Sequence, residues 1–260
     1  MNDRRRFSFG RNWQKYLDDL PPEATDAMRA YVAEWLGADL TGLRVVDVGS
    51  GQGLTSLSVT RLGGEVLSFD LDPDSVAATR RLREAAGSPG TWRVEQGSIL
   101  DRSFVYTLGT FDIVVSWGVL HHTGAIWAAI DAAAGLVAPD GRLWIALYHR
   151  TRQSGLSLRI KRLYASLPRP GKLAMRGAYA SAKIAKSLAV RRRLPALRGA
   201  YDARGMNWWR DIEDWLGGLP YEVASPGEVL DRLRPMGFEL ERLHDAIGES
   251  GNDVYLFRRG

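Results

Sequence analysis

Hydrophobic residues occur in short blocks that alternate with helix-like stretches from about residue 43 onward. The first block, 43–48, contains three valines and is typical of a buried β-strand. The stretch "LTSLSVTRLGG" at 54–64 then predicts a helix, and "EVLSFDLDP" at 65–73 predicts a second strand. A strand, loop, helix and strand in this order predict a parallel α/β sheet.

Three glycines at alternate positions, Gly49, Gly51 and Gly53, directly follow the first predicted strand. Glycine permits positive φ and lets a ligand approach the backbone closely. A dinucleotide fingerprint would need its third glycine where this chain has Leu54, and no Gly-Lys-Ser/Thr follows as it would in a P-loop. The spacing therefore argues against a nicotinamide-dependent oxidoreductase and against a P-loop.

Together with Asp47, these glycines form the pattern D-x-G-x-G-x-G, which resembles the first motif of class I S-adenosylmethionine (SAM) methyltransferases. The resemblance extends over about residues 40–150 and 224–258. In that family the loop surrounds the amino-acid end of SAM, so the resemblance implies SAM as the cofactor and an acid near its cationic end. The loop residues that it assigns to the cofactor are Asp47, Gly49, Ser50, Gly51 and Gly53.

Further cofactor contacts follow from the same resemblance. Asp70 ends the second predicted strand, 17 residues after Gly53, and matches the acidic residue that accepts hydrogen bonds from both ribose hydroxyls. "TWRVEQGSIL" at 91–100 resembles the third strand of the family, and many relatives carry Asp where this chain has Ser98. The other implied contacts are Gly97, Ser98 and Ile99 at the adenine, Leu71, Ser116 and Trp117, and Trp13 and Tyr16 from an N-terminal segment that folds over SAM in many relatives.

The remaining strands complete the fold class. "FDIVVSWGVLHHTG" and "DGRLWIALYH" resemble strands four and five, and "NDVYLFRR" resembles the last, antiparallel strand. The order predicts an α/β, doubly wound, seven-stranded Rossmann-like methyltransferase sheet with an α-helical cap inserted after strand five. Residues 1–260 are expected to form a single methyltransferase domain, made of an N-terminal helical segment over the cofactor (1–40), a SAM-binding core (41–150), a basic helical cap (151–223), and a last helix with a terminal β-hairpin (224–260).

Composition adds few constraints. A chain of 260 residues with 45% hydrophobic content is large enough to bury the core of one α/β domain. It contains no apolar run of the length that spans a membrane, and its first residues lack the apolar region of a signal peptide, so we expect a cytoplasmic protein. The absence of cysteine excludes disulfides and thiolate metal ligands.

Charge is distributed very unevenly. Residues 151–210 contain 15 Lys or Arg and one acid, Asp202, a net charge of +14 in a chain whose total is +5. Leu156, Ile160, Leu163, Tyr164 and Leu167 fall on one predicted helical face, whereas Arg159, Lys161 and Arg162 fall elsewhere. A second helix is predicted from about 172 to 190.

This basic segment has four interpretations: a lid for an anionic substrate, a peripheral membrane contact, a nucleic-acid groove, or a solvated cap. Nucleic acid is disfavoured, because only Tyr164 and Tyr179 are aromatic between 151 and 200 and stacking platforms are therefore few. The position after strand four also lacks the Asn/Asp-Pro-Pro-Tyr type of motif that many amino-N nucleic-acid methyltransferases carry. We therefore expect a small-molecule or lipid-like acceptor.

Candidate catalytic residues lie just beyond strands four and five. His121, His122 and His149 follow these strands, whose carboxyl ends face the ligand crevice of an open α/β sheet. Methyl transfer to a hydroxyl requires positioning of the nucleophile and removal of a proton, for which histidine is suited. We take these three histidines as base candidates and Tyr148 as an orienting hydroxyl. Carboxylates with metal-ligand spacing do not accompany them, so no metal is expected.

One further aromatic-rich stretch follows the basic segment. Residues 204–226 contain Trp208, Trp209 and Tyr221, which we assign to the acceptor pocket, with plain core packing as the alternative. The sequence thus predicts a SAM-dependent methyltransferase that acts on a small molecule or lipid-like intermediate, and we favour oxygen as the methylated atom. The alternatives are a C- or N-methyltransferase, an RNA methyltransferase and a non-catalytic SAM-binding protein.

Overall fold

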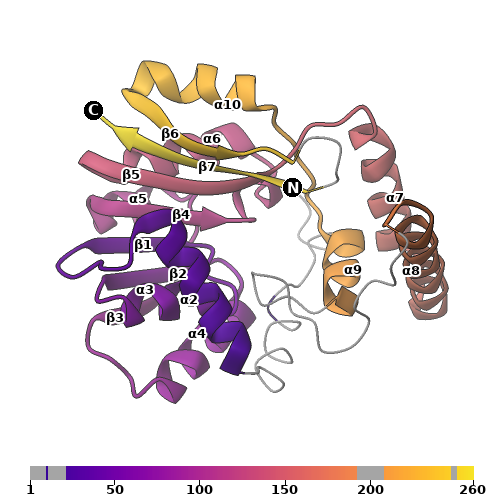
Figure 1. Cartoon of the computed structure of the whole chain (residues 1–260), viewed down its shortest axis with the longest axis horizontal. Coiled ribbons are helices and arrows are strands. Elements are labelled where there is room, and N and C mark those ends of the chain that lie inside the picture. Colours follow the sequence, from indigo (N-terminus) through magenta and orange to yellow (C-terminus); the bar gives the residue numbers. More distant parts are fainter. Residues whose placement is uncertain (1–9, 11–21, 192–207, 247–250) are drawn as a thin grey trace.

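The computed structural model describes residue 10 and residues 22–191, 208–246 and 251–260, with the backbone alone at 22, 186, 190, 191 and 208–211. Its centre is one seven-stranded sheet with the order β3-β2-β1-β4-β5-β7-β6 (Figure 1). The strands are β1 (Arg44–Val48), β2 (Glu65–Asp70), β3 (Trp92–Gln96), β4 (Phe111–Trp117), β5 (Val137–Tyr148), β6 (Phe238–His244) and β7 (Asn252–Arg259). Strands β1 to β5 pair in parallel, and β7 lies antiparallel between β5 and β6. The predicted doubly wound sheet is confirmed.

Helices connect the strands and cover both faces of the sheet. They are α2 (Pro22–Leu36), α3 (Leu54–Arg61), α4 (Pro73–Ala85), α5 (Arg102–Leu108), α6 (Ile126–Gly135), α7 (Ser154–Ser166), α8 (Arg169–Arg191), α9 (Trp208–Gly217) and α10 (Pro226–Leu233), with the short 3-10 helices η2 (Leu120–His122) and η3 (Arg234–Met236). Helices α2 and α3 pack on one face of the sheet, and α6 and α10 pack on the other.

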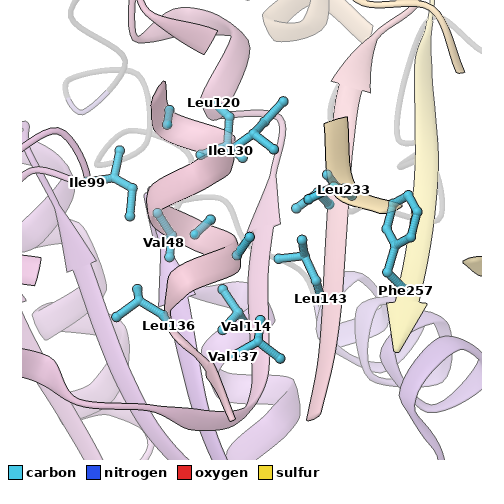
Figure 2. Packing of buried hydrophobic residues seen from close by; sticks show 14 of the residues in the cluster. Val48, Ile99, Val114, Leu120, Ile130, Leu136, Val137, Leu143, Leu233 and Phe257 are labelled. Atoms are coloured by element: carbon cyan, nitrogen blue, oxygen red, sulfur yellow. The ribbon is translucent and has the colours of Figure 1, made fainter. Parts of the chain in front are cut away.

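The two faces carry two separate hydrophobic clusters. Because successive side chains of a strand point to opposite faces, Val45 belongs to one cluster and Val46 to the other. Figure 2 shows the cluster under α6 and α10, in which Leu120 lies beside Ile130 and the strand residue Val114 lies beside Val137. These strands are buried on both sides, which explains their nearly continuous runs of apolar residues.

Capping residues fix the starts of several helices. Asp72 accepts a hydrogen bond from the Asp74 backbone N–H at 3.0 Å and is followed by proline, a favoured first helical residue. Ser225 and Glu228 form a complete capping box at the start of α10. These local signals place α4 and α10 independently of the rest of the fold.

The segment after β5 forms helices α7, α8 and α9, which lie beyond the carboxyl end of β5 and away from the sheet (Figure 1). They share a small cluster of buried residues: Tyr164, Ala180, Ile212 and Leu216. The two helices predicted in this segment correspond to α7 and α8. The role of the three helices as a cap over the cavity stays a prediction. None of the described helices is both long enough and apolar enough to cross a membrane.

One assignment within α7 was wrong. Lys161, which the sequence analysis placed away from the apolar face, is completely buried, whereas Leu156 and Leu163 of the predicted apolar face are more than half exposed. The physical reason is that Lys161 packs among aromatic rings from the end of β5 and from residues after α8, which accept a lysine side chain and its charge.

Candidate functional site

A cavity of about 720 Å³ lies at the carboxyl ends of the parallel strands, within the size range of small-molecule sites. It lies where the strand order reverses between β1 and β4, the point at which open α/β sheets bind ligands. One end is lined by the glycine loop after β1 and the end of β2, and the other by η2, the end of β5 and residues of α8 and α9. The cavity therefore joins the predicted cofactor residues to the predicted catalytic ones.

The glycine loop takes a backbone course that other residues rarely adopt. Gly49, Gly51 and Gly53 have φ values of 78°, 54° and 86°. A Cβ on Gly49 would lie 2.4 Å from Val119 Cγ1, so the loop packs directly against the segment that follows β4. Gly49, Ser50 and Gly51 line the cavity, whereas Gly53 lies behind the lining and starts α3.

Asp70 orders the loop and faces the cavity. Its Oδ2 accepts the Gly51 backbone N–H at 3.1 Å, and its Oδ1 accepts that of Asp72 at 2.9 Å. Burial raises the pKa of Asp70 to about 6, although these hydrogen bonds favour the ionised form. A carboxylate has about four lone-pair sites, more than its backbone donors use, so it can also accept from donors such as vicinal hydroxyls.

Asp47 ends a buried chain of hydrogen bonds. The Trp92 indole N–H donates to Ser68 Oγ at 2.7 Å, the Ser68 and Ser56 hydroxyls lie 2.6 Å apart, and Ser56 Oγ donates to Asp47 Oδ2 at 2.6 Å. Burial raises the pKa of Asp47 to about 6. Asp47 also lines the cavity, so this network holds one carboxylate beside the glycine loop.

The other predicted cofactor residues divide into three groups. Leu71, Gly97, Ser98, Ile99 and Trp117 line the cavity. Ser116 does not, and its hydroxyl donates to the Val48 carbonyl at 3.0 Å. Trp13 and Tyr16 lie outside the described residues. The neighbouring Gly10 is described, and its backbone N–H donates to Asp72 Oδ2 at 3.0 Å at the edge of the cavity.

His122 has a defined tautomer. Its Nδ1 lies 2.6 Å from the Pro220 carbonyl oxygen, which can only accept, so Nδ1 carries the proton and Nε2 carries the lone pair. Burial, together with the charge of Lys161, lowers the pKa of His122 to about 3, although the hydrogen bond to Pro220 acts in the opposite direction. The ring lines the cavity, and a Cβ on Gly218 would lie 2.8 Å from its Cε1. The end of α9 thus holds a neutral imidazole in place.

His121 has the opposite tautomer. The Tyr148 backbone N–H donates to its Nδ1 at 3.2 Å, so the lone pair of Nδ1 is engaged. Burial, the neighbouring His122 and Lys161 hold the pKa of His121 well below its usual value. The two rings lie 4.4 Å apart and both line the cavity, and they differ in tautomer: the lone pair lies on Nε2 in His122 and on Nδ1 in His121.

The third histidine lies apart from this pair. His149 Nδ1 lies 2.8 Å from Asp253 Oδ2, and His149 is not among the residues that line the cavity. His149, Asp245 and Asp253 form a cluster of the kind that could hold a metal ion, because their potential ligand atoms all lie within 4.8 Å of one another. The fully buried Asp253 also accepts the Ala246 N–H and the Tyr255 hydroxyl, so the cluster ties the ends of β5, β6 and β7 together.

Tyr148, the predicted orienting hydroxyl, lines the cavity, and its ring centroid lies 3.9 Å from that of His121. Tyr221 lies behind the lining, 5.3 Å from the Tyr148 ring. The side chains of Trp208 and Trp209 lie outside the described set. All these roles stay predictions.

Sequence analysis missed several groups at this end of the cavity. Tyr179 and Lys183 of α8 and Asp214 and Trp215 of α9 line it, and Lys161 lies buried behind it. The signal that pointed to the buried lysine was Tyr164, one helical turn later, which shares the face of α7 that Lys161 occupies. The others come together only when α8 and α9 pack side by side.

Comparison with known proteins gives a consistent picture. Residues 46–143 match the family model described as a methyltransferase domain. The ubiquinone biosynthesis O-methyltransferase of Xanthomonas oryzae pv. oryzae (strain PXO99A) is 38% identical over 138 residues, which are 53% of this chain and 54% of the relative. The chain thus spans about half the length of the curated relatives that it matches.

Solved structures resemble the whole fold. Magnesium protoporphyrin IX methyltransferase from Synechocystis PCC 6803, with bound S-adenosylhomocysteine (SAH), superimposes with a TM-score of 0.55 at 16% identity, covering 92% of this chain and 83% of that chain. An O-methyltransferase family protein from Burkholderia thailandensis gives a TM-score of 0.57 at 18% identity, covering 91% and 56%. At these identities the similarity shows the fold.

The His122 environment predicts an imidazole that stays neutral in acid. We expect His122 to protonate only near pH 3 in the folded protein, because burial and Lys161 disfavour the charged ring. The unfolded chain then binds more protons between pH 3 and about 6.5, so the contribution of His122 to stability is present above about pH 6.5 and is lost as the pH falls. Ring ¹⁵N NMR titration measures this, with the exposed His244 as internal reference. A midpoint near pH 6 for His122 would contradict the described environment.

Proposed function

Since this chain belongs to the class I SAM-dependent methyltransferase family, we propose that it transfers a methyl group from SAM to a hydroxyl group of a small molecule. The curated relatives are named as O-methyltransferases of ubiquinone biosynthesis, which supports oxygen as the acceptor atom. The observation that carries the proposal is that one cavity is lined by the glycine loop and Asp70 at one end and by the His122 ring at the other.

The residues at one end of the cavity fit SAM. The glycine loop exposes its backbone, Asp70 can accept from the ribose hydroxyls, and Asp47 supplies a carboxylate near the expected amino-acid end. Gly97, Ser98 and Ile99 offer a flat surface for the adenine, where a Cβ on Gly97 would lie 2.2 Å from the Phe104 ring. When bound, SAM supplies a methyl group already activated on a sulfonium.

The other end of the cavity provides the proton acceptor. His122 Nε2 takes the proton of the acceptor hydroxyl while the oxygen electron pair forms the new bond to the methyl carbon and the carbon–sulfur bond breaks. The Pro220 carbonyl holds the ring in the orientation and tautomer that this step requires.

The same environment favours an aromatic hydroxyl as acceptor. With its pKa lowered to about 3, His122 is a weak base, and phenols (pKa about 10) release a proton far more readily than aliphatic alcohols. Trp117, Tyr148, Tyr179 and Trp215 line the cavity and would pack against a planar ring. We therefore propose a phenol-type acceptor.

We propose in addition that α7 and α8 contact an anionic membrane surface. Leu156, Leu163 and Leu173 are 57%, 55% and 65% exposed on these two helices. Exposed arginines of the same helices, among them Arg159 and Arg162, would pair with lipid phosphates. Such a contact would place the cavity near lipid-like acceptors.

The cofactor assignment predicts a defined effect at Asp70. Asp70→Asn should weaken SAH binding by about 10- to 100-fold, because hydrogen bonds to a charged partner contribute about 1.5–3 kcal/mol. In the unchanged protein, affinity should also fall below about pH 6, since the raised pKa of Asp70 lets it protonate there. Calorimetry measures both, with NAD as the ligand expected not to bind. Asp112→Asn, which alters a carboxylate that accepts the Arg44 N–H at 2.8 Å away from the cavity, is the control. Equal SAH affinity in the Asp70 and Asp112 variants would refute the placement.

The base assignment predicts a loss of turnover at His122. His122→Ala should lower kcat by about 10²- to 10⁴-fold with 3,4-dihydroxybenzoate as reference acceptor, because general base catalysis is worth that much. SAH affinity should change by less than about threefold, since binding at the glycine loop does not use the ring. His244→Ala on the exposed face of β6 is the matched control. Undiminished methylation by the His122 variant across the pH range would assign the proton to another group.

The membrane contact predicts retention by charged vesicles. The unchanged protein should co-sediment with phosphatidylglycerol vesicles and not with phosphatidylcholine vesicles, and added salt should release it. A triple change of Leu156, Leu163 and Leu173 to Asp should abolish retention. Leu240→Asp, at a leucine of β6 that is 36% exposed, is the control. Retention of the triple variant equal to that of this control would exclude α7 and α8 as the contact.

A further inference from the structure

Lys161 is a buried cation on the inner face of the basic helix α7, which it shares with the buried Tyr164. It is 0% exposed, whereas Arg159 and Arg162 on either side of it are exposed. Removing a lysine ammonium from water is costly unless the protein replaces the lost hydration. A lysine that faced solvent would satisfy solubility equally well, so the buried position requires a specific reason.

Aromatic rings and one carbonyl surround the ammonium. Nζ lies 4.7 Å from the ring centroid of Trp215, 4.9 Å from that of Tyr221 and 5.5 Å from that of Tyr148. Nζ also donates to the Trp215 carbonyl oxygen. Cation–π contacts with three rings and a backbone hydrogen bond fix the charge in a low-dielectric surrounding, where its effect on neighbours is large.

The residues that hold Lys161 also hold the two histidines. Segment 215–222 supplies the Trp215 carbonyl and the Tyr221 ring to Lys161, the Pro220 carbonyl to His122 Nδ1, and the Glu222 N–H to the His121 carbonyl at 3.0 Å. The Tyr148 ring lies near both groups, with its centroid 5.5 Å from Lys161 Nζ and 5.3 Å from that of His122. One segment and one ring thus connect α7 to the proposed base.

We propose that Lys161 is a positioning residue for the acceptor end of the cavity, a fixed positive charge that braces segment 215–222 against the histidine pair and keeps His122 able to accept a proton. This inference rests on the proposed function, in which His122 is the base. Through the same charge, Lys161 also favours negative charge on an acceptor oxygen that approaches His122.

The electrostatics agree with this geometry. Lys161 lowers the pKa of both histidines, and it is the charged group that does so for His122. Other ionisable groups near His122 are His121 on η2, Tyr148 on β5, Asp214 on α9, Lys183 on α8, and Tyr221 and Glu222 in the connecting segment. Removal of the lysine charge should therefore make protonation of His122 easier and ionisation of the acceptor harder, so both effects move activity toward higher pH.

The test compares Lys161→Met with Lys161→Arg and measures the ring ¹⁵N titration of His122. The Met variant should raise the titration midpoint of His122 by about one pH unit, as expected for one buried charge nearby, and the Arg variant should retain the original midpoint. Lys161→Gln, which keeps a donor for the Trp215 carbonyl, replaces the Met variant if the latter fails to fold. Lys172→Met is the matched control. Lys172 of α8 also makes a cation–π contact, with Nζ 5.6 Å from the Tyr164 ring centroid, but it does not line the cavity.

With 3,4-dihydroxybenzoate, and with SAM kept saturating at every pH so that protonation of Asp70 does not set the limb, the acidic limb of kcat/KM for the acceptor should move to higher pH in the Met variant and stay in place in the Lys172 control. A folded Met or Gln variant whose His122 midpoint is unchanged would overturn the inference, as would lower activity with an unmoved acidic limb, which marks a purely structural lysine. The NMR titration needs no methyl transfer. A midpoint that shifts in a protein that neither binds SAH nor methylates would therefore support the Lys161 placement and refute the proposed function.

Discussion

The pairing of β1 with β4 is the constraint on which both ends of the cavity depend. Val45 pairs with Ile113 and Asp47 pairs with Val115, although β1 and β4 are far apart in the chain. The strand order of the sheet reverses between these two strands. At this reversal the connections leave in opposite directions, and a crevice opens at the carboxyl ends. The glycine loop leaves β1 on one side and η2 follows β4 on the other. The two connections pack closely, because a Cβ added to Gly49 would lie only 2.4 Å from Val119 Cγ1.

Buried polar groups give the two ends of this crevice opposite chemical character. At the cofactor end, hydroxyl and backbone donors surround the carboxylates of Asp47 and Asp70, and burial raises the pKa of each to about 6. At the acceptor end, two imidazoles are kept neutral by burial and by the ammonium of Lys161. A cationic sulfonium is accordingly expected beside acids, and a hydroxyl proton beside a neutral base. This separation of charge within one cavity is what the proposed reaction requires.

Helices α7 to α9 make the acceptor end specific to this chain. The core elements that line the cofactor end belong to the part that matches the methyltransferase domain, residues 46–143, whereas Lys161, Tyr179 and Trp215 lie beyond it. The cation–π contacts of Lys161 and the hydrogen bond from His122 to Pro220 connect these helices to the core. The acceptor preference is therefore expected to depend on residues outside the matched region.

The sequence by itself determined the sheet, the glycine loop and Asp70, because these depend on local signals: β-branched runs, glycine spacing and an acid at a strand end. It also brought His121 and His122 to the correct edge, since residues after parallel strands must gather there. It did not determine which ring nitrogen of each histidine carries the lone pair. That depends on the Pro220 carbonyl, 98 residues from His122, and on the Tyr148 N–H. It likewise placed Lys161 away from the apolar face of its helix, since helical periodicity identifies a face but not the aromatic rings that Tyr148, Trp215 and Tyr221 bring to the lysine. Only the tertiary structure decided the tautomers and the burial of that charge, because both arise from contacts between segments that have no relation in sequence.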